Sequence, residues 1–108
     1  WNAATHGRVN FSFSVGTTSY EWPSVRRVQN ELDPGLLGVT RKPFIDIEAD
    51  QIAPDMFTGV AAHEFGQWLG VPHIHEPAAL MFPTVHNNMV ITESDLATFK
   101  KIYPGLSE

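Results

Sequence analysis

The sequence contains no cysteine, which excludes disulfide bonds and thiolate metal ligands. Only His, Asp, Glu and neutral oxygen atoms are then available to hold a metal ion. The chain also lacks an apolar run long enough to span a bilayer. Its Lys and Arg residues are few, 7 against 12 acidic residues, and they form no continuous basic stripe. We therefore expect neither a membrane nor a nucleic acid as a partner.

The length of 108 residues is enough for one domain with a single core and too short for two ordinary domains. The apolar fraction of 43% and the aromatic fraction of 11% are typical of a globular protein. The chain begins at Trp1 without an initiator Met or a leader, as a processed form, a fragment or a trimmed chain would. We expect residues 1–108 to form one domain, and the sequence does not indicate its oligomeric state.

The first half of the chain contains three segments with the patterns of secondary structure. Apolar and polar residues alternate from Val9 to Val15, which predicts a strand with one buried face. Apolar residues at helical spacing predict a short helix over Pro23–Leu32, which an Asp-Pro-Gly sequence then ends. The β-favouring run Phe44–Ile47 predicts a second strand.

The second half contains two helices with clearer boundaries. The first runs from Phe57 or Thr58 to Leu69, where Gly70 is suited to end it in a left-handed turn. Pro72 prevents its continuation, so the chain reverses direction before His73. The apolar stripe expected on this helix consists of Phe57, Ala61, Phe65 and Trp68 or Leu69, with Val60, His63, Glu64 and Gln67 on another face.

The last helix has a recognisable start and end. Thr92 is an N-cap candidate, and Glu93 and Asp95 place acidic groups in the first turn. The apolar residues that follow have helical spacing, and Pro104-Gly105 stops the run. This helix is the second element that the sequence predicts clearly.

The most informative stretch is HEFGQWLGVPH, residues 63–73. A His-Glu pair with a second His four residues after the first is a common zinc-binding arrangement, because side chains four apart share one helical face. Here His63 and Glu64 are present, Gln67 takes the place of the second His, and His73 follows the turn. An isolated His-Glu pair on a helix is usually only a polar face, so the surrounding residues decide its meaning.

These residues resemble the HExxHxxGxxH motif of metzincin metallopeptidases, and they are most similar to the matrixin branch, which includes the matrix metalloproteinases. Ala79–Pro83 resembles the Met-turn of that branch, at the same interval from His73. Asp95 and residues 102–105 resemble its C-terminal helix and closing sequence. The resemblance covers roughly the second half of the chain and is faint before Asp55. We expect the family's long first helix to be mostly or wholly absent, unless residues 1–4 are its tail. It implies a secreted zinc endopeptidase with a peptide or protein substrate.

A catalytic zinc ion takes three protein ligands and keeps one position for water, and imidazole is a favoured ligand. His63 and His73 supply two such ligands. Glu64, next in sequence to a ligand, is expected to accept the proton of the attacking water and pass it to the leaving amine. Glu64 is therefore the predicted catalytic residue.

The resemblance also implies roles outside the motif. Met81 would form an apolar floor beneath the metal site, although a buried Met is by itself most simply core filler. Residues Pro83, Thr84 and Val85 would line the pocket for the substrate side chain that follows the scissile bond. An extended substrate would lie antiparallel to an edge strand, for which Phe44–Ile47 is the candidate.

Gln67 keeps the position of the second His but changes its donor atom. An amide oxygen is a weaker zinc donor than imidazole, so we expect a poor third ligand and a weak site. One alternative recruits His75 as a replacement nitrogen, although an exposed loop His is the simpler interpretation. Another removes the metal altogether and leaves an inactive pseudopeptidase that binds peptides or proteins in the same cleft.

The sequence thus predicts an α+β domain of the metzincin type, in which a small twisted sheet packs on the active-site helix and is joined to a Met-turn and a C-terminal helix. The favoured function is zinc-dependent hydrolysis of peptide bonds, impaired by Gln67. Glu64 would act as the base, and one zinc ion would be held by His63, His73 and, poorly, Gln67.

Overall fold

The computed structural model describes residues 1–5, 23–29, 31–84, 86 and 89–104. Within these residues a three-stranded sheet of mixed direction is followed by two α-helices, so the predicted α+β class is confirmed. The predicted strand from Val9 to Val15 lies outside the described residues. The strands are β1 (Ser24–Arg27), β2 (Gly38–Arg41) and β3 (Phe44–Ile47), the helices are α1 (Phe57–Trp68) and α2 (Glu93–Ile102), and two short 3-10 helices, η1 (Ala49–Gln51) and η2 (Pro54–Met56), precede α1.

The helix predicted over Pro23–Leu32 is wrong, because β1 occupies part of this segment. β1 runs parallel to β3, with Arg26 opposite Asp46 in the register. The guanidinium of Arg26 donates two hydrogen bonds to the Asp46 carboxylate, at 2.7 and 2.9 Å, and lies 3.9 Å from the centre of the Phe44 ring. These contacts with a strand 20 residues away hold the segment extended in spite of its helical spacing.

The strand predicted at Phe44–Ile47 is confirmed, but its predicted place at the sheet edge is wrong. β3 is the middle strand, in the order β1-β3-β2, and Ile45 and Ile47 are almost fully buried. β2 was not predicted, and it pairs antiparallel with β3 after a two-residue turn. Among the described residues β2 therefore forms one edge of the sheet, and it is the edge strand that packs on α1.

Helix α1 ends within one residue of its predicted boundary. Gly70 has a φ of 91°, the left-handed conformation expected for it. Its N–H donates to the Gln67 carbonyl, and the Val71 N–H donates to the Gly66 carbonyl, so two carbonyls of the last turn are paired. The chain can then turn back along the helix toward His73.

The predicted apolar stripe of α1 is only partly correct. Phe57 is exposed, whereas three other members of the stripe are half-buried against the core beside the sheet. The other face, which carries Val60, His63 and Glu64, is the more deeply buried one, because the helix is covered both by the sheet and by the segment that follows Gly70. The stripe residues in the core beside the sheet are Ala61, Phe65 and Trp68, and the buried residues of α1 are Gly59, Val60, His63, Glu64 and Gly66.

Helix α2 begins as predicted, with a capping box between Thr92 and Asp95. Asp95 is fully buried and also accepts hydrogen bonds from the N–H groups of Leu80 and Met81, at 2.8 and 3.0 Å. One carboxylate therefore joins the start of α2 to the segment around Met81. A second core cluster, made of Val71, Leu80, Met81 and Phe99, fills the space around this junction.

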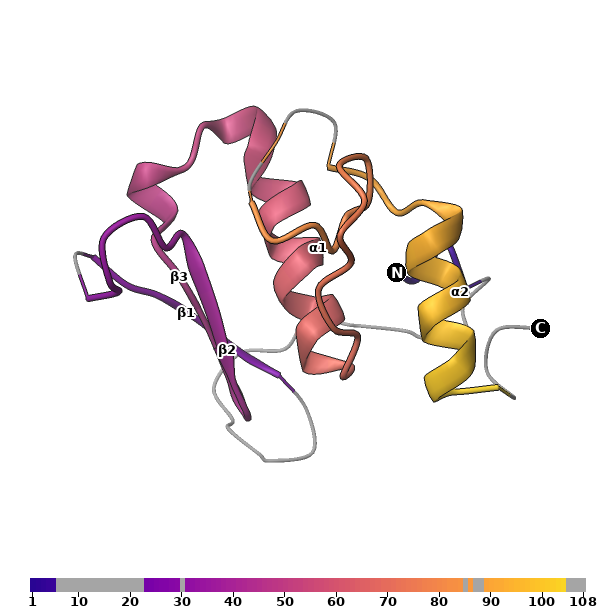
Figure 1. Ribbon diagram of the computed structural model, residues 1–108. Helices are drawn as coiled ribbons and strands as arrows, with labels where there is room; N and C mark the ends of the chain where they lie inside the picture. The colour runs from indigo at the N-terminus through magenta and orange to yellow at the C-terminus, as the bar shows by residue number, and fades with distance from the viewer. Residues whose placement is uncertain (6–22, 30, 85, 87–88, 105–108) are drawn as a thin grey trace.

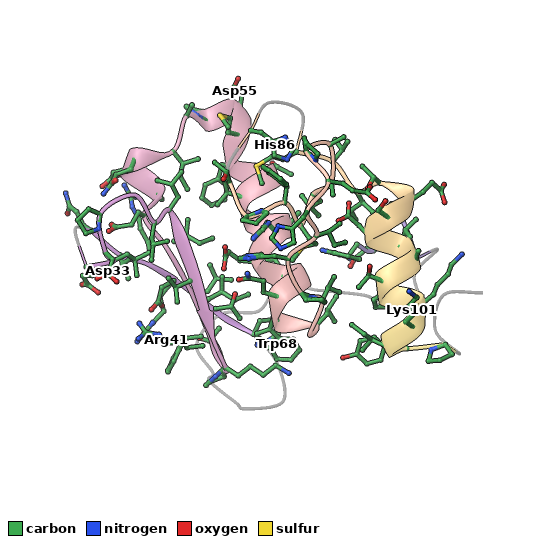
Figure 2. The ribbon with its side chains drawn as sticks, viewed as in Figure 1. Asp33, Arg41, Asp55, Trp68, His86 and Lys101 are labelled. Atoms are coloured by element: carbon green, nitrogen blue, oxygen red, sulfur yellow. The ribbon has the colours of Figure 1, made fainter. Side chains whose placement is uncertain are left out.

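Figure 1 shows α1 between the sheet on one side and α2 on the other, with the chain after Gly70 passing between the two helices. The N-terminus lies beside α2, where the Trp1 ring contacts Phe99 and its Nε1 donates to the Ala62 carbonyl at 2.8 Å. Figure 2 shows side chains filling the spaces on both sides of α1, with Trp68 at its C-terminal end. No helix in the described part of the chain has the length and apolar character needed to cross a membrane.

Candidate active site

Most of the predicted site residues line a cleft of about 450 Å³ between β2 and α1. α1 contributes His63, Glu64 and Gln67, and the segment after its end contributes His73. The opposite wall is β2 together with the residues that lead into it. The other lining residues are Gly35, Leu36, Leu37, Gly38, Val39, Thr40, Val60, Phe82, Pro83, Thr84 and Met89.

Glu64 is buried, and β2 determines the position of its carboxylate. The Thr40 hydroxyl lies 2.9 Å from Glu64 Oε1 and 3.0 Å from the Glu64 main-chain oxygen. Gly38 provides the space, since a Cβ there would lie 2.9 Å from the end of the Glu64 side chain. Burial raises the pKa of the Glu64 carboxyl above its ordinary value, while the Thr40 hydrogen bond and the nearby His73 lower it.

Replacing Thr40 with Val is expected to lower the free energy of unfolding by about 1 kcal/mol, because the shape of the side chain is kept while the hydrogen bonds to Glu64 are lost. Urea denaturation measures this difference. The matched control is Thr40→Ser, which keeps the hydroxyl and should stay closer to the unmodified chain. Equal stability of Thr40→Val and the unmodified chain would contradict the assigned bonds.

His63 has the arrangement of a ligand whose second ring nitrogen is held by the protein. Its Nδ1 lies 2.8 Å from the Leu80 carbonyl oxygen. Because a carbonyl can only accept, Nδ1 carries the hydrogen and Nε2 carries the lone pair. Burial lowers the pKa of His63, which favours the neutral ring that a metal requires.

His73 lies beside His63, with the ring centroids 5.3 Å apart. His73 is exposed by its accessible surface, and the partial desolvation of its ring, followed by the neighbouring His63, lowers its pKa. Its Nε2 is hydrogen-bonded to Nε2 of Gln67 at 2.7 Å. The donor set therefore fits a zinc ion at two imidazoles, while the third position offers an amide. In keeping with this, the described residues contain no group of three His, Asp or Glu side chains able to hold a metal.

The remaining predicted residues lie in different surroundings. Met81 is fully buried against α1, where a Cβ at Gly66 would come within 2.6 Å of its sulfur. Pro83 and Thr84 line the cleft, and Val85 lies outside the described residues. His75 is exposed and is not part of the cleft lining.

The geometry of the cleft agrees with a comparison of the sequence with known families. The sequence profile of the matrixin family matches residues 13–104. The chain belongs to the matrixin family. Matrixins are zinc metalloendopeptidases that act on proteins, and their fold accounts for the order of sheet, helix, turn and C-terminal helix seen here. No solved structure matches the chain significantly.

The matrixin match also extends over the first half of the chain, where the motif-based resemblance is faint before Asp55. This half contains the site residues that the sequence analysis missed, namely Gly38 and Thr40. The only local signal for them is the short run Gly38–Arg41, with β-branched residues at its centre. The part played by the Leu80 carbonyl has no sequence signal, since any residue carries that group.

Proposed function

We propose that this matrixin domain hydrolyses peptide bonds of extended substrates with a zinc ion in the cleft, and that Gln67 keeps the activity low. The observation that carries the proposal is the convergence of Glu64, His63 and His73 on one cleft beside an edge strand. A buried carboxylate next to two neutral imidazoles is the combination that hydrolysis at a metal requires.

His63 and His73 would hold the ion, and Gln67 lies where a third ligand is needed. When bound, zinc supplies Lewis-acid polarisation of the scissile carbonyl and lowers the pKa of water to about 7. The Leu80 carbonyl fixes the ring of His63 and leaves Nε2 available for the metal. This support would help the site to keep a metal even with one weak position.

Glu64 would take the proton from the attacking water and deliver it to the leaving amine. Because Oε1 accepts the Thr40 hydroxyl, we assign the proton transfer to Oε2. Burial of the carboxyl raises its pKa above the ordinary value, which makes it a stronger base. Thr40 and Gly38 thus orient the base from the opposite wall of the cleft.

The substrate would bind as an added strand along β2, which replaces Phe44–Ile47 as the candidate edge. β2 has no second partner strand within the described residues, and three of its residues line the cleft. Pro83 and Thr84 remain the proposed walls of the pocket for the side chain after the scissile bond. Leu36, Leu37 and Phe82 make the lining of the cleft partly apolar, which favours an apolar side chain.

Zinc content and peptide cleavage, measured on the same unmodified chain, test the proposal. We expect slow cleavage of a mixed peptide library that stops when a chelator removes the metal and returns on addition of zinc. Persistence of cleavage in the metal-free chain would contradict the proposal. Size-exclusion chromatography with activity measured across the peak checks that the cleavage comes from this chain, and activity that elutes apart from the chain would also contradict the proposal.

The hydrogen bond between Gln67 and His73 favours one alternative, a metal-free domain that binds peptides along β2 without cutting them. A comparison of the unmodified chain with Gln67→His distinguishes the binding module from the impaired peptidase. A binding module retains peptides in the cleft and gains neither zinc nor cleavage when Gln67 is replaced by His, whereas an impaired peptidase gains both.

A further inference from the structure

The hydrogen bond between Gln67 and His73 occupies Nε2 of His73, the ring nitrogen that we assign to the proposed metal site. Nε2 of His73 lies 2.7 Å from Nε2 of Gln67. An imidazole nitrogen has either one hydrogen or one lone pair, directed in the plane of the ring, so it serves one partner at a time. While this hydrogen bond exists, Nε2 of His73 cannot bind a metal ion.

The conclusion does not depend on the orientation of the Gln67 amide. With the nitrogen toward the ring, Gln67 donates to the lone pair of His73. With the amide oxygen in that place, Nε2 carries a hydrogen and donates it to Gln67. In both orientations Nε2 is occupied, and the hydrogen bond must break before this nitrogen of His73 can become a ligand.

The two histidines therefore differ in whether Nε2 is available to bind a metal ion. Nε2 of His63 carries a lone pair because Nδ1 donates to Leu80, as described above. His73 is held by the side chain that stands in the position of the missing ligand. The difference comes from one residue on α1, one helical turn after His63.

We propose that Gln67 opposes zinc binding by holding Nε2 of His73 in a hydrogen bond, and does not serve as a third ligand. Zinc must displace this bond, so the bond lowers the affinity of the site. The inference rests on the proposed metal site of His63 and His73, but it does not depend on peptide cleavage.

The main chain around His73 does not depend on Gln67 to keep its place. Val71 is buried and its N–H donates to the Gly66 carbonyl. On the other side, the Ile74 N–H donates to the Met81 carbonyl at 2.9 Å. Removal of the Gln67 side chain should therefore release the ring of His73 without moving the segment that carries it.

The two roles of Gln67 predict opposite effects of the same substitution. If Gln67 were a ligand, Gln67→Ala would weaken zinc binding. If it competes with the metal, Gln67→Ala frees His73, and water can take the third position. We expect zinc to bind Gln67→Ala about fivefold more tightly than the unmodified chain, the factor that corresponds to one neutral hydrogen bond of ordinary net strength.

The experiment is a competition titration of zinc against a chromogenic chelator, with the unmodified chain, Gln67→Ala and the control Gln51→Ala. Gln51 is an exposed glutamine on η1, so its removal should leave the affinity unchanged. Thermal unfolding of all three chains checks that they are folded. Tighter binding by Gln67→Ala alone supports the proposal, and weaker or equal binding overturns it.

A second measurement needs no metal. In nitrogen-correlated NMR spectra of the zinc-free chains, His73 should show one fixed tautomer in the unmodified chain and a mixture of tautomers in Gln67→Ala, while His63 keeps its single tautomer in both. Identical His73 signals in the two chains overturn the proposal, even if neither chain binds zinc. Failure of the proposed peptidase function is a separate outcome, because it is read from cleavage and not from these spectra.

Discussion

Replacing Gln67 with His is expected to raise the zinc affinity of the chain, and its rate of peptide cleavage at limiting zinc, by roughly tenfold to a hundredfold or more. The substitution has two effects that act in the same direction. It supplies an imidazole on the helical face of His63, and it removes the amide that holds His73. Helix α1 accepts His at this half-buried position, so the fold should be kept.

Cleavage of a fluorogenic peptide at controlled zinc concentration measures this gain. The matched control is Gln51→His, which adds an imidazole to an exposed position on η1, outside the cleft lining. A rise in both variants would show that any added surface histidine recruits zinc. A Gln67→His chain that is folded and no more active than the unmodified one would contradict the account of position 67.

Replacing Glu64 with Ala in the Gln67→His chain is expected to reduce the cleavage rate by roughly a hundredfold to ten-thousandfold, the usual contribution of a positioned general base. The reason is the loss of Glu64 itself, the one carboxylate that the described residues contribute to the cleft lining. Zinc binding should persist, because Glu64 is not a proposed ligand. The Gln67→His background provides a rate from which such a loss can be measured.

Glu64→Gln separates proton transfer from packing in the same assay. The amide can still bond to the Thr40 hydroxyl, and it has nearly the same volume, but it cannot take the proton of the attacking water. We therefore expect Glu64→Gln to lose about as much activity as Glu64→Ala while remaining the more stable of the two variants. Retention of more than about a tenth of the activity by either variant would show that another group is the base.

The sequence predictions were accurate for elements that local interactions determine, and inaccurate for elements that depend on contacts with distant parts of the chain. The end of α1 and the start of α2 were predicted to within a residue or so. The reason is that Gly70 and the pair Thr92 and Asp95 act on the backbone next to them in the sequence. β1 was predicted as a helix, since its extended form depends on a partner strand and on the pair Arg26 and Asp46. β2 has only four residues, and its place at the edge of the sheet that the described residues form cannot be derived from its own composition.

The candidate site shows the same division. His63, Glu64, Gln67 and His73 were found together because one helix and one turn bring them together. The residues that orient them come from elsewhere in the chain. Thr40 lies on a strand that was not predicted. The Leu80 carbonyl is placed by Asp95, which accepts a hydrogen bond from the Leu80 N–H. The position of Asp95 in the first turn of α2 did not indicate this contact. Such contacts arise only from tertiary packing.

The central claim is that the cleft of this matrixin holds one zinc ion between His63 and His73, weakened at Gln67. The most direct test is the metal content of the purified chain beside Gln67→His, after both are dialysed against the same micromolar zinc. We predict one zinc per chain in Gln67→His and partial occupancy in the unmodified chain, lost on His63→Ala but not on His75→Ala. Absence of zinc from a folded Gln67→His chain would contradict the claim.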